Sequence, residues 1–231
     1  MLCTHCGMHT AVTKGGLCEE CAALGDEPAV RIEPPVSRPV SSGRLRSPVG
    51  LSYALVVLFW VWAVSDLVAL AGRRWGPDVL FDLGSGVEGL VWIACALTFL
   101  TWFYRVRDNA EVFAPGSQSK GRRWAFWGWG LPVVNLWFPR RIAVDAWVAS
   151  TQRRADGSVP PPSYGIINLW WACWLLSSVT VYFPGSADSD PLLALTAVVD
   201  VASAVTAALF VRQLTCRQNV LAQKGPVAAA A

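Results

Sequence analysis

Residues 51–71 read LSYALVVLFWVWAVSDLVALA, and this stretch decides the class of fold. Its only charged residue is Asp66, and its length matches the roughly 20 mostly apolar residues that a helix needs to cross a bilayer. A helix on the surface of a soluble core would instead carry polar residues at helical spacing along one face. The stretch therefore predicts a transmembrane helix.

Three later windows repeat this pattern, at residues 84–104, 165–183 and 191–211. Glu88 in the first of them and Asp200 in the last are the only charged residues that they hold. Over the whole chain 54% of residues are hydrophobic and 15% are charged, against about 25% charged in soluble proteins. We therefore expect an all-α polytopic membrane protein with four transmembrane helices.

A fifth apolar stretch, residues 124–138, is short and interrupted. It contains two glycines and Pro132, and Pro139 follows it. Lysine and arginine concentrate in cytoplasmic loops, so the possible topologies can be compared by where they place these residues. If the stretch does not cross and the N-terminus is cytoplasmic, Arg73 and Arg74 are the only ones of the 19 basic residues outside. If it crosses, seven more move outside.

This comparison places residues 124–151 on the cytoplasmic side as a Trp-rich re-entrant or interfacial element, with both termini cytoplasmic. Its tryptophans suit that location, because indole rings prefer the headgroup region. Pro139 fits the first turn of a helix over about residues 140–151, where its missing N–H is not needed. Arg141 and Asp145 are four residues apart and are expected to pair on that helix.

Four cysteines stand near the start of the chain in two pairs of the form Cys-x2-Cys. They are Cys3, Cys6, Cys18 and Cys21. Two such pairs can hold one ion in the tetrahedral thiolate coordination of structural zinc sites. We therefore expect residues 1–24 to form a small zinc knuckle that depends on the metal for folding. Iron–sulfur ligation is the alternative, and His5 and His9 are ligands of second choice.

The knuckle carries little positive charge, since Lys14 is its only basic residue against Glu19 and Glu20. Nucleic-acid binding needs clustered basic residues, so we expect a cytoplasmic protein partner and no nucleic acid. A disulfide is disfavoured because the charge comparison puts this segment in the reducing cytoplasm. Residues 25–50, rich in Pro, Ser and Arg, predict a flexible linker to the membrane domain.

Three ionisable residues lie inside the predicted spans: Asp66, Glu88 and Asp200. An ionisable side chain in lipid is costly and by default indicates a functional site, here a proton or cation site that opens outward. The first two alternatively reach headgroup water or pair with Arg73 and Arg74. Asp200 lies near the midplane and needs a partner across the bundle. Its candidate partners by residue type are Asn168, Ser177, Ser178 and Thr180.

The region from residue 102 to residue 150 has a distinctive order. It runs WFYRVRDNA at 102–110, WGW at 127–129, PVVNL at 132–136, Pro139, and WVAS at 147–150. This block resembles the bacterial membrane family of domain of unknown function 4328, common in actinobacteria, and the resemblance extends over residues 51–219. The cysteine segment resembles a zinc-ribbon head that some such proteins carry, and residues 220–231 are expected to be a disordered tail.

The resemblance implies an architecture and no catalytic residue, because the family has no assigned biochemistry. Physically, the amides of the block can satisfy irregular backbone next to a proline, which predicts a cytoplasmic packing plug. The alternative is a surface that binds lipid headgroups or a partner. The residues concerned are Asn109, Trp129, Pro132, Asn135, Pro139 and Trp147.

No Ser/His/Asp set is possible in the predicted spans, because both histidines belong to the cysteine segment, and the spans contain no nucleophile or metal-ligand set. We therefore expect a non-enzymatic adaptor or regulatory protein of the plasma membrane, whose zinc head contacts a cytoplasmic protein. The alternative is a small proton- or cation-coupled transporter or channel component that uses the intramembrane carboxylates. A membrane enzyme ranks third.

The predicted topology can be tested with single cysteines introduced at positions 78, 118, 156 and 188. An impermeant thiol reagent outside intact cells should label positions 78 and 188. Positions 118 and 156 should stay protected, because they lie in cytoplasmic loops. External labelling of position 156 would contradict the re-entrant placement of residues 124–151.

Overall fold

The computed structural model describes residues 45–76, 78–154, 156–181 and 190–225, together with Thr10, Val12 and Gly15. Within these ranges the chain forms α-helices and one 3₁₀ turn and no β-strand, so the all-α prediction is confirmed for them. The elements are α2 (Val49–Trp75), α3 (Asp78–Phe113), α4 (Trp124–Gly130), η2 (Val134–Leu136), α5 (Phe138–Ala149), α6 (Gly165–Val181) and α7 (Asp190–Lys224). The cysteine quartet lies outside the described residues.

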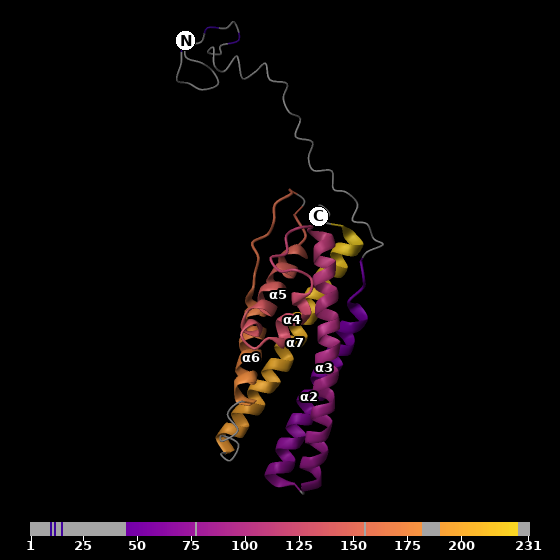
Figure 1. Cartoon of the computed structure of the whole chain (residues 1–231), viewed down its shortest axis with the longest axis vertical. Coiled ribbons are helices and arrows are strands. Elements are labelled where there is room, and N and C mark those ends of the chain that lie inside the picture. Colours follow the sequence, from indigo (N-terminus) through magenta and orange to yellow (C-terminus); the bar gives the residue numbers. More distant parts are fainter. Residues whose placement is uncertain are drawn as a thin grey trace. The chain divides into compact units, whose positions relative to one another are not determined.

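The four long helices form two antiparallel hairpins, α2–α3 and α6–α7, and α2 packs along α7 (Figure 1). The indole N–H of Trp102 on α3 donates to the Thr215 hydroxyl on α7 at 3.0 Å. The C-terminal ends of α3 and α7 therefore lie at the same end of the bundle. The start of α2 lies there too, because Asn109 of α3 bonds to the backbone of Arg46.

Three helices are long and apolar enough to cross a membrane: α2, residues Phe81–Phe113 of α3, and residues Ala194–Lys224 of α7. These agree with three of the four predicted spans. Helix α6 is apolar but has 17 residues, which at 1.5 Å per residue extend about 26 Å. That length is near the lower limit for a hydrocarbon core of about 30 Å. Crossing by α6 stays a prediction.

Helices α3 and α7 continue well past their apolar windows. Helix α3 ends at Phe113 instead of residue 104, and α7 ends at Lys224, beyond the boundary predicted at residue 220. The apolar windows end where charged residues begin. The helices continue past these residues because the charged side chains make contacts of their own. Arg107, for example, pairs with Glu111 one turn later at 2.9 Å. Helix α2 begins at Val49, inside the linker predicted for residues 25–50.

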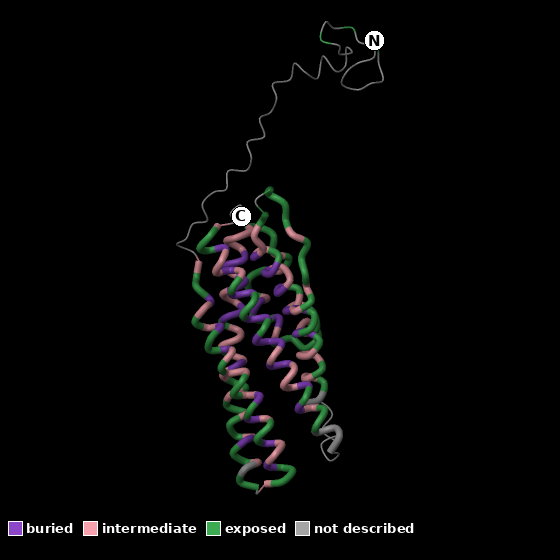
Figure 2. The backbone as a smooth tube through the Cα atoms, turned by 180° about the vertical axis from the view of Figure 1, so that it is seen from behind, coloured by how far each residue is buried: buried purple, intermediate pink, exposed green. Residues whose placement is uncertain are grey.

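The buried core occupies the half of the bundle where α2 starts and α3 and α7 end (Figure 2). Aromatic rings fill much of it, and Trp170 stacks on Phe210 with 4.4 Å between ring centroids. In the other half most of the chain is exposed or half-buried (Figure 2). Leu90 on α3, for example, is 72% exposed. Soluble monomers rarely expose apolar surface over such a length, so this half is suited to contact with lipid.

The segment from α4 to α5 enters and leaves the bundle at the same end. Ser119, which precedes α4, donates its backbone N–H to Asp145 of α5 at 2.9 Å, and its hydroxyl donates to the same carboxylate. Between these points Trp129 reaches inward to Phe99 of α3 and Trp174 of α6, at 5.3 and 5.4 Å between ring centroids. The seven residues of α4 extend only about 10 Å. The placement of this segment as a re-entrant or interfacial element in a membrane stays a prediction.

Helix α5 begins two residues before the start predicted from the sequence. Pro139 occupies its first turn, as expected from the missing N–H. Arg141 and Asp145 pair at 3.5 Å, which confirms the predicted ion pair. The helix packs against both α3 and α6, so the segment from α4 to α5 separates these two helices at this end of the bundle.

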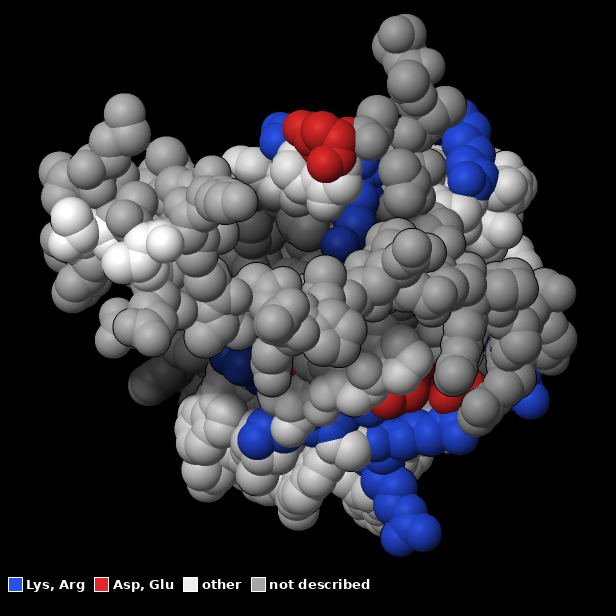
Figure 3. All heavy atoms as spheres, turned by 90° about the horizontal axis from the view of Figure 1, so that it is seen from above, with Lys and Arg blue, Asp and Glu red and all other residues white. Residues whose placement is uncertain are grey.

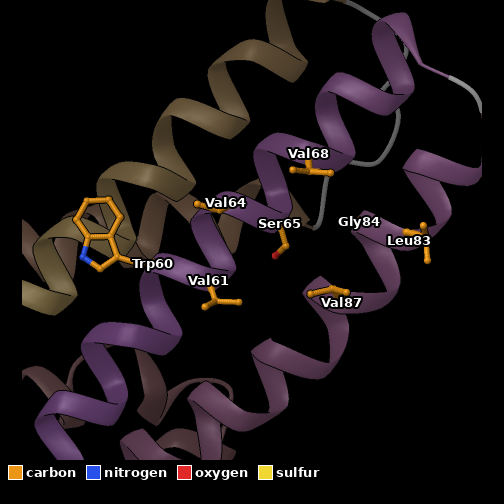
Figure 4. A pocket seen from close by; sticks show the side chains of 8 residues that line it. All are labelled: Trp60, Val61, Val64, Ser65, Val68, Leu83, Gly84 and Val87. Carbon is orange, nitrogen blue, oxygen red and sulfur yellow. The ribbon is translucent and has the colours of Figure 1, made fainter.

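Helices α2 and α3 approach each other closely where Gly84 faces Ala69. A Cβ atom at Gly84 would lie 2.8 Å from the backbone nitrogen of Ala69 and 2.9 Å from its Cα. Small residues allow such close contact between membrane helices. An apolar groove of 540 Å³ opens beside this contact, lined by Trp60 and by aliphatic side chains of both helices (Figure 4). The hydroxyl of Ser65 in the groove bonds to the carbonyl of Trp62 at 2.8 Å.

This contact predicts that Gly84→Ala destabilises the protein. The added methyl group would clash with the Ala69 backbone, which can move away only if α2 and α3 separate. Overpacking of this kind costs about 1–3 kcal/mol, so the thermal midpoint of the detergent-solubilised protein should fall by several degrees. The matched control is Gly86→Ala on the same helix, where an added Cβ meets nothing within 4 Å. Alanine is the better helix former, so the control should be neutral or stabilising. Equal midpoints for the two variants would contradict the close contact.

Candidate functional site

The three intramembrane carboxylates come from three helices and lie near one another. Asp66 of α2 lies within electrostatic range of Glu88 of α3 and of Asp200 of α7, and Glu88 lies within that range of Asp200. Each is half-buried. Each carboxylate lies nine or ten residues from the helix end that is opposite Arg46 in the bundle. This separation is about 14–15 Å along the helix axis at 1.5 Å per residue. The fold thus brings three carboxylates from three helices into one region of the bundle, which we call the carboxylate cluster.

Asp200 has one of the partners predicted for it. The hydroxyl of Ser177 on α6 donates to Asp200 Oδ1 at 2.5 Å. Asn168 and Ser178, which were candidates by residue type, bond elsewhere. The side chain of Thr180 lies outside the described residues. Helix α6 therefore contributes a neutral donor to the cluster.

Asp66 and Glu88 are satisfied less completely than Asp200. Asp66 Oδ2 is buried and has no hydrogen-bond partner among the described residues. The indole of Trp62 lies beside the Glu88 carboxylate, but its N–H completes no hydrogen bond within the described part of the chain. The cluster therefore keeps free acceptor capacity.

The chemistry open to such a cluster follows from its charge and spacing. Carboxylates grouped at low dielectric repel one another when ionised, and a proton or a cation relieves that repulsion. In the described ranges no three Asp, Glu, His or Cys side chains are close enough to hold a metal ion together. The arrangement suits proton binding, or a cation held partly through water, better than tight coordination of a divalent metal.

A second polar assembly closes the opposite end of the bundle. We call it the Asn109 clasp, and it comprises Asn109, Gln218, Ser150 and the backbone of Arg46. The Asn109 side chain accepts from the Arg46 N–H at 3.0 Å and donates to the Arg46 carbonyl at 2.8 Å. It also donates to Gln218 Oε1 at 3.0 Å.

The Gln218 amide completes the clasp by donating to the Val106 carbonyl at 2.8 Å and to the Ser150 hydroxyl at 3.2 Å. The side chains of Asn109, Gln218 and Ser150 belong to residues no more than 3% exposed. Because buried amides are expensive to leave unpaired, this network fixes how α3, α5 and α7 meet.

The other predicted residues of the Trp-rich block occupy packing positions. Trp147 is 2% exposed, and the guanidinium of Arg217 lies 3.9 Å from its ring centroid. Pro139 is buried at the start of α5, and Trp129 lies among the core rings.

Pro132 and Asn135 lie in the turn between α4 and α5. Pro132 is exposed there. The backbone N–H of Asn135 donates to the Leu131 carbonyl at 2.8 Å, whereas its Oδ1 is buried without a partner among the described residues. The amide of Asn109 bonds to irregular backbone, that of Arg46, whereas the role expected for the Asn135 side chain stays a prediction.

Gln218 is the main site residue that the sequence reasoning missed. It follows Val211 and Leu214 at spacings of seven and four residues, and both of these are fully buried. That spacing places all three on one face of α7, which is a usable signal. It went unused because hydropathy marked the end of the span at residue 211.

Residues 66–216 match the family model described as Domain of unknown function (DUF4328). The chain belongs to this family. The resemblance carried by the block from residue 102 to residue 150 is thereby confirmed. Among curated proteins and solved structures, none matches the chain.

The DUF4328 match begins at Asp66 and ends at residue 216. It therefore contains the whole carboxylate cluster and Asn109, whereas Gln218 lies just past its end and Arg46 well before its start. The cysteine quartet is also outside it, so the family assignment carries no statement about metal.

The Asn109 clasp of this DUF4328 protein predicts that Asn109→Leu lowers stability. The variant keeps the branching of the side chain but is larger, and it leaves Gln218 and the Arg46 backbone without partners, a loss of about 1–3 kcal/mol. Thermal unfolding in detergent should show the lower midpoint. The control is Gln223→Ala, whose exposed amide bonds only to Asn219, at 3.3 Å. Equal midpoints for the two variants would show that the clasp does not stabilise the fold.

Proposed function

We propose that this DUF4328 protein crosses the plasma membrane four times and uses its carboxylate cluster to bind protons or cations, as a small transporter or channel component. The observation that carries this proposal is the convergence of Asp66, Glu88 and Asp200 from three separate helices. Ionisable residues inside spans face the bundle interior when they line an ion or proton path.

The path of the chain supports four crossings. Helices α3, α5 and α7 all contribute to the Asn109 clasp, and α7 ends there. Helix α7 therefore starts at the opposite end, and the chain has to travel there after α5. Helix α6 is the described helix that covers this path, and its Ser177 bonds to Asp200 of α7. If α2, α3 and α7 each cross, α6 crosses too.

The distribution of charge supports cytoplasmic termini. The clasp end of the bundle contains Arg46 and the last turn of α7 with Lys224. Figure 3, which views the molecule from above, has described Lys and Arg side chains at several places on this face. Arg73 and Arg74 are in the last turn of α2 at the opposite end. An excess of basic residues at one end favours the cytoplasm for it.

Occupation of the cluster is coupled to the arrangement of the helices. The carboxylates lie on α2 and α3 of one hairpin and on α7 of the other. Ionised carboxylates repel one another and push the two hairpins apart, whereas a bound proton or cation lets the hairpins approach. A ligand that binds one arrangement better shifts the equilibrium toward it. This coupling gives a physical basis for transport or for sensing of the ion.

The transport proposal predicts a proton or monovalent-cation flux in proteoliposomes, measured with entrapped ion-sensitive dyes. Asp200→Asn should reduce the flux by at least about tenfold, since it removes one charge from the cluster while keeping the shape and the Ser177 contact. The control is Asp82→Asn, an exposed carboxylate on α3 outside the cluster. Flux that is absent from the unaltered protein, or unchanged by Asp200→Asn, would remove the reason for the proposal.

A second function, that of a non-enzymatic adaptor with a cytoplasmic zinc head, is favoured by the way the chain enters the bundle. The Arg46 backbone is held by Asn109, and the next carbonyl, that of Ser47, accepts from Arg105 at 2.8 Å. A displacement of the preceding chain is therefore transmitted to the clasp. The proposed zinc ligands are Cys3, Cys6, Cys18 and Cys21, with iron–sulfur ligation as the alternative.

The adaptor proposal predicts about one zinc ion per purified chain and a cytoplasmic protein that co-purifies with it. Cys18→Ser should remove both, because a structural site folds only with its metal. Cys216→Ser is the control, since Cys216 is an exposed free cysteine on α7. Iron in place of zinc would support the alternative cluster. A partner that still co-purifies after deletion of residues 1–44 would contradict the adaptor role.

A further inference from the structure

We propose that Arg140, held against Asn168, binds the phosphate of an anionic phospholipid in the cytoplasmic leaflet. Arg140 stands in the first turn of α5 and Asn168 in the first turn of α6. The Nε and Nη2 atoms of Arg140 both donate to Asn168 Oδ1, at 3.2 and 2.6 Å. The pair thus lies where the apolar run of α6 begins, at the level of the membrane interface.

Arg140 differs from Arg107, Arg122 and Arg141 because no described carboxylate neutralises it. Among the described residues, three ion pairs are present at this end of the bundle. They are Arg107 with Glu111, Arg122 with Asp108, and Arg141 with Asp145. Within the described ranges Arg140 has only an amide oxygen as partner. A guanidinium carries five N–H donors, so several remain for an incoming anion.

The surroundings of the pair are apolar and open. Leu136 and Trp137, which precede Arg140, are 52% and 51% exposed, and Leu169 beside Asn168 is 53% exposed. Tryptophan at the edge of a membrane protein sits at headgroup level, with apolar neighbours below it. A half-buried cation within such a rim matches the boundary between headgroups and acyl chains.

An anionic phospholipid complements both features of this site, the cationic guanidinium of Arg140 and the exposed apolar side chains around it. Its phosphate oxygens suit the fork of N–H donors on arginine, which binds phosphate in a bidentate manner. Its acyl chains cover the exposed rim of Leu136, Trp137 and Leu169. A zwitterionic lipid offers the same chains, but its ammonium group offsets the attraction to arginine. Basic sites between helices on the cytoplasmic side bind anionic headgroups in this way.

The test is native mass spectrometry of the full-length protein in detergent, titrated with phosphatidylglycerol or with phosphatidylcholine of the same acyl chains. The unaltered protein should bind phosphatidylglycerol more tightly. Arg140→Gln should weaken that binding about tenfold, the size expected for losing a hydrogen bond to a charged group. Arg141→Gln removes the same charge from the next residue, which pairs with Asp145, and should keep the preference.

A second variant separates lipid binding from packing between α5 and α6. Asn168→Asp keeps the acceptor for Arg140 and adds the carboxylate that the site lacks. The preference for phosphatidylglycerol should be lost while the thermal midpoint stays at or above that of the unaltered protein. This variant decides the question even if Arg140→Gln does not fold.

Five outcomes would overturn the proposal. The first two are no preference in the unaltered protein and a preference that survives Arg140→Gln. If Arg141→Gln lowered the preference for phosphatidylglycerol as much as Arg140→Gln does, the preference would come from the overall surface charge and not from Arg140. Displacement of the lipid by millimolar inorganic phosphate would indicate a site for the free anion. A changed oligomeric state of Arg140→Gln with unchanged lipid preference would indicate a contact between copies. None of these outcomes bears on the ion flux, so failure here leaves the carboxylate proposal standing.

Discussion

Trp129 extends from α4 into the space between α3 and α6, and its indole meets rings from both helices. The contacts are edge-to-face with Phe99 and Phe103 on one side and with Trp174 on the other, at 5.3 to 5.8 Å between centroids. Such pairs contribute about 0.5–1.5 kcal/mol each beyond the area that they bury. Helices α2 and α7 pack directly, whereas α3 and α6 are joined largely through this insertion. The two hairpins are therefore held together most firmly at one end.

This uneven packing separates two kinds of polar group. In the firmly packed half, the buried amides of Asn109 and Gln218 are satisfied by several hydrogen bonds. In the more open half, Asp66 retains a buried oxygen without a described partner. Native proteins satisfy nearly all buried polar atoms, and the exceptions concentrate at sites with a function. Neutral or paired groups of the firmly packed half, such as Asn135 Oδ1 and the indole nitrogens of Trp129 and Trp147, also lack described partners. The carboxylate cluster is therefore distinguished by its charge inside an apolar bundle, and not by an unpaired oxygen alone.

The sequence predicted well those features that depend on local pattern. Apolar windows located the long helices, and the spacing of Arg141 and Asp145 predicted an ion pair that is present. It could not predict that Asp66, Glu88 and Asp200 meet, because hydropathy gives depth along a helix but no rotation about its axis. The clasp was missed for a related reason. A lone glutamine beyond an apolar window resembles a solvated residue until its buried neighbours are known.

The clasp also sets an order of assembly. Asn109 joins residues that the ribosome delivers early, such as Arg46, to Gln218 in the last described helix. Until α7 has been made, the hairpin of α2 and α3 carries Asn109 and Trp102 without their later partners, Gln218 and Thr215. Unpaired amides are unstable in hydrocarbon, so this end of the hairpin must stay in contact with water or with the insertion machinery during synthesis. Helix α7, the last of the described helices, thus secures the chain where it enters α2, the first of them.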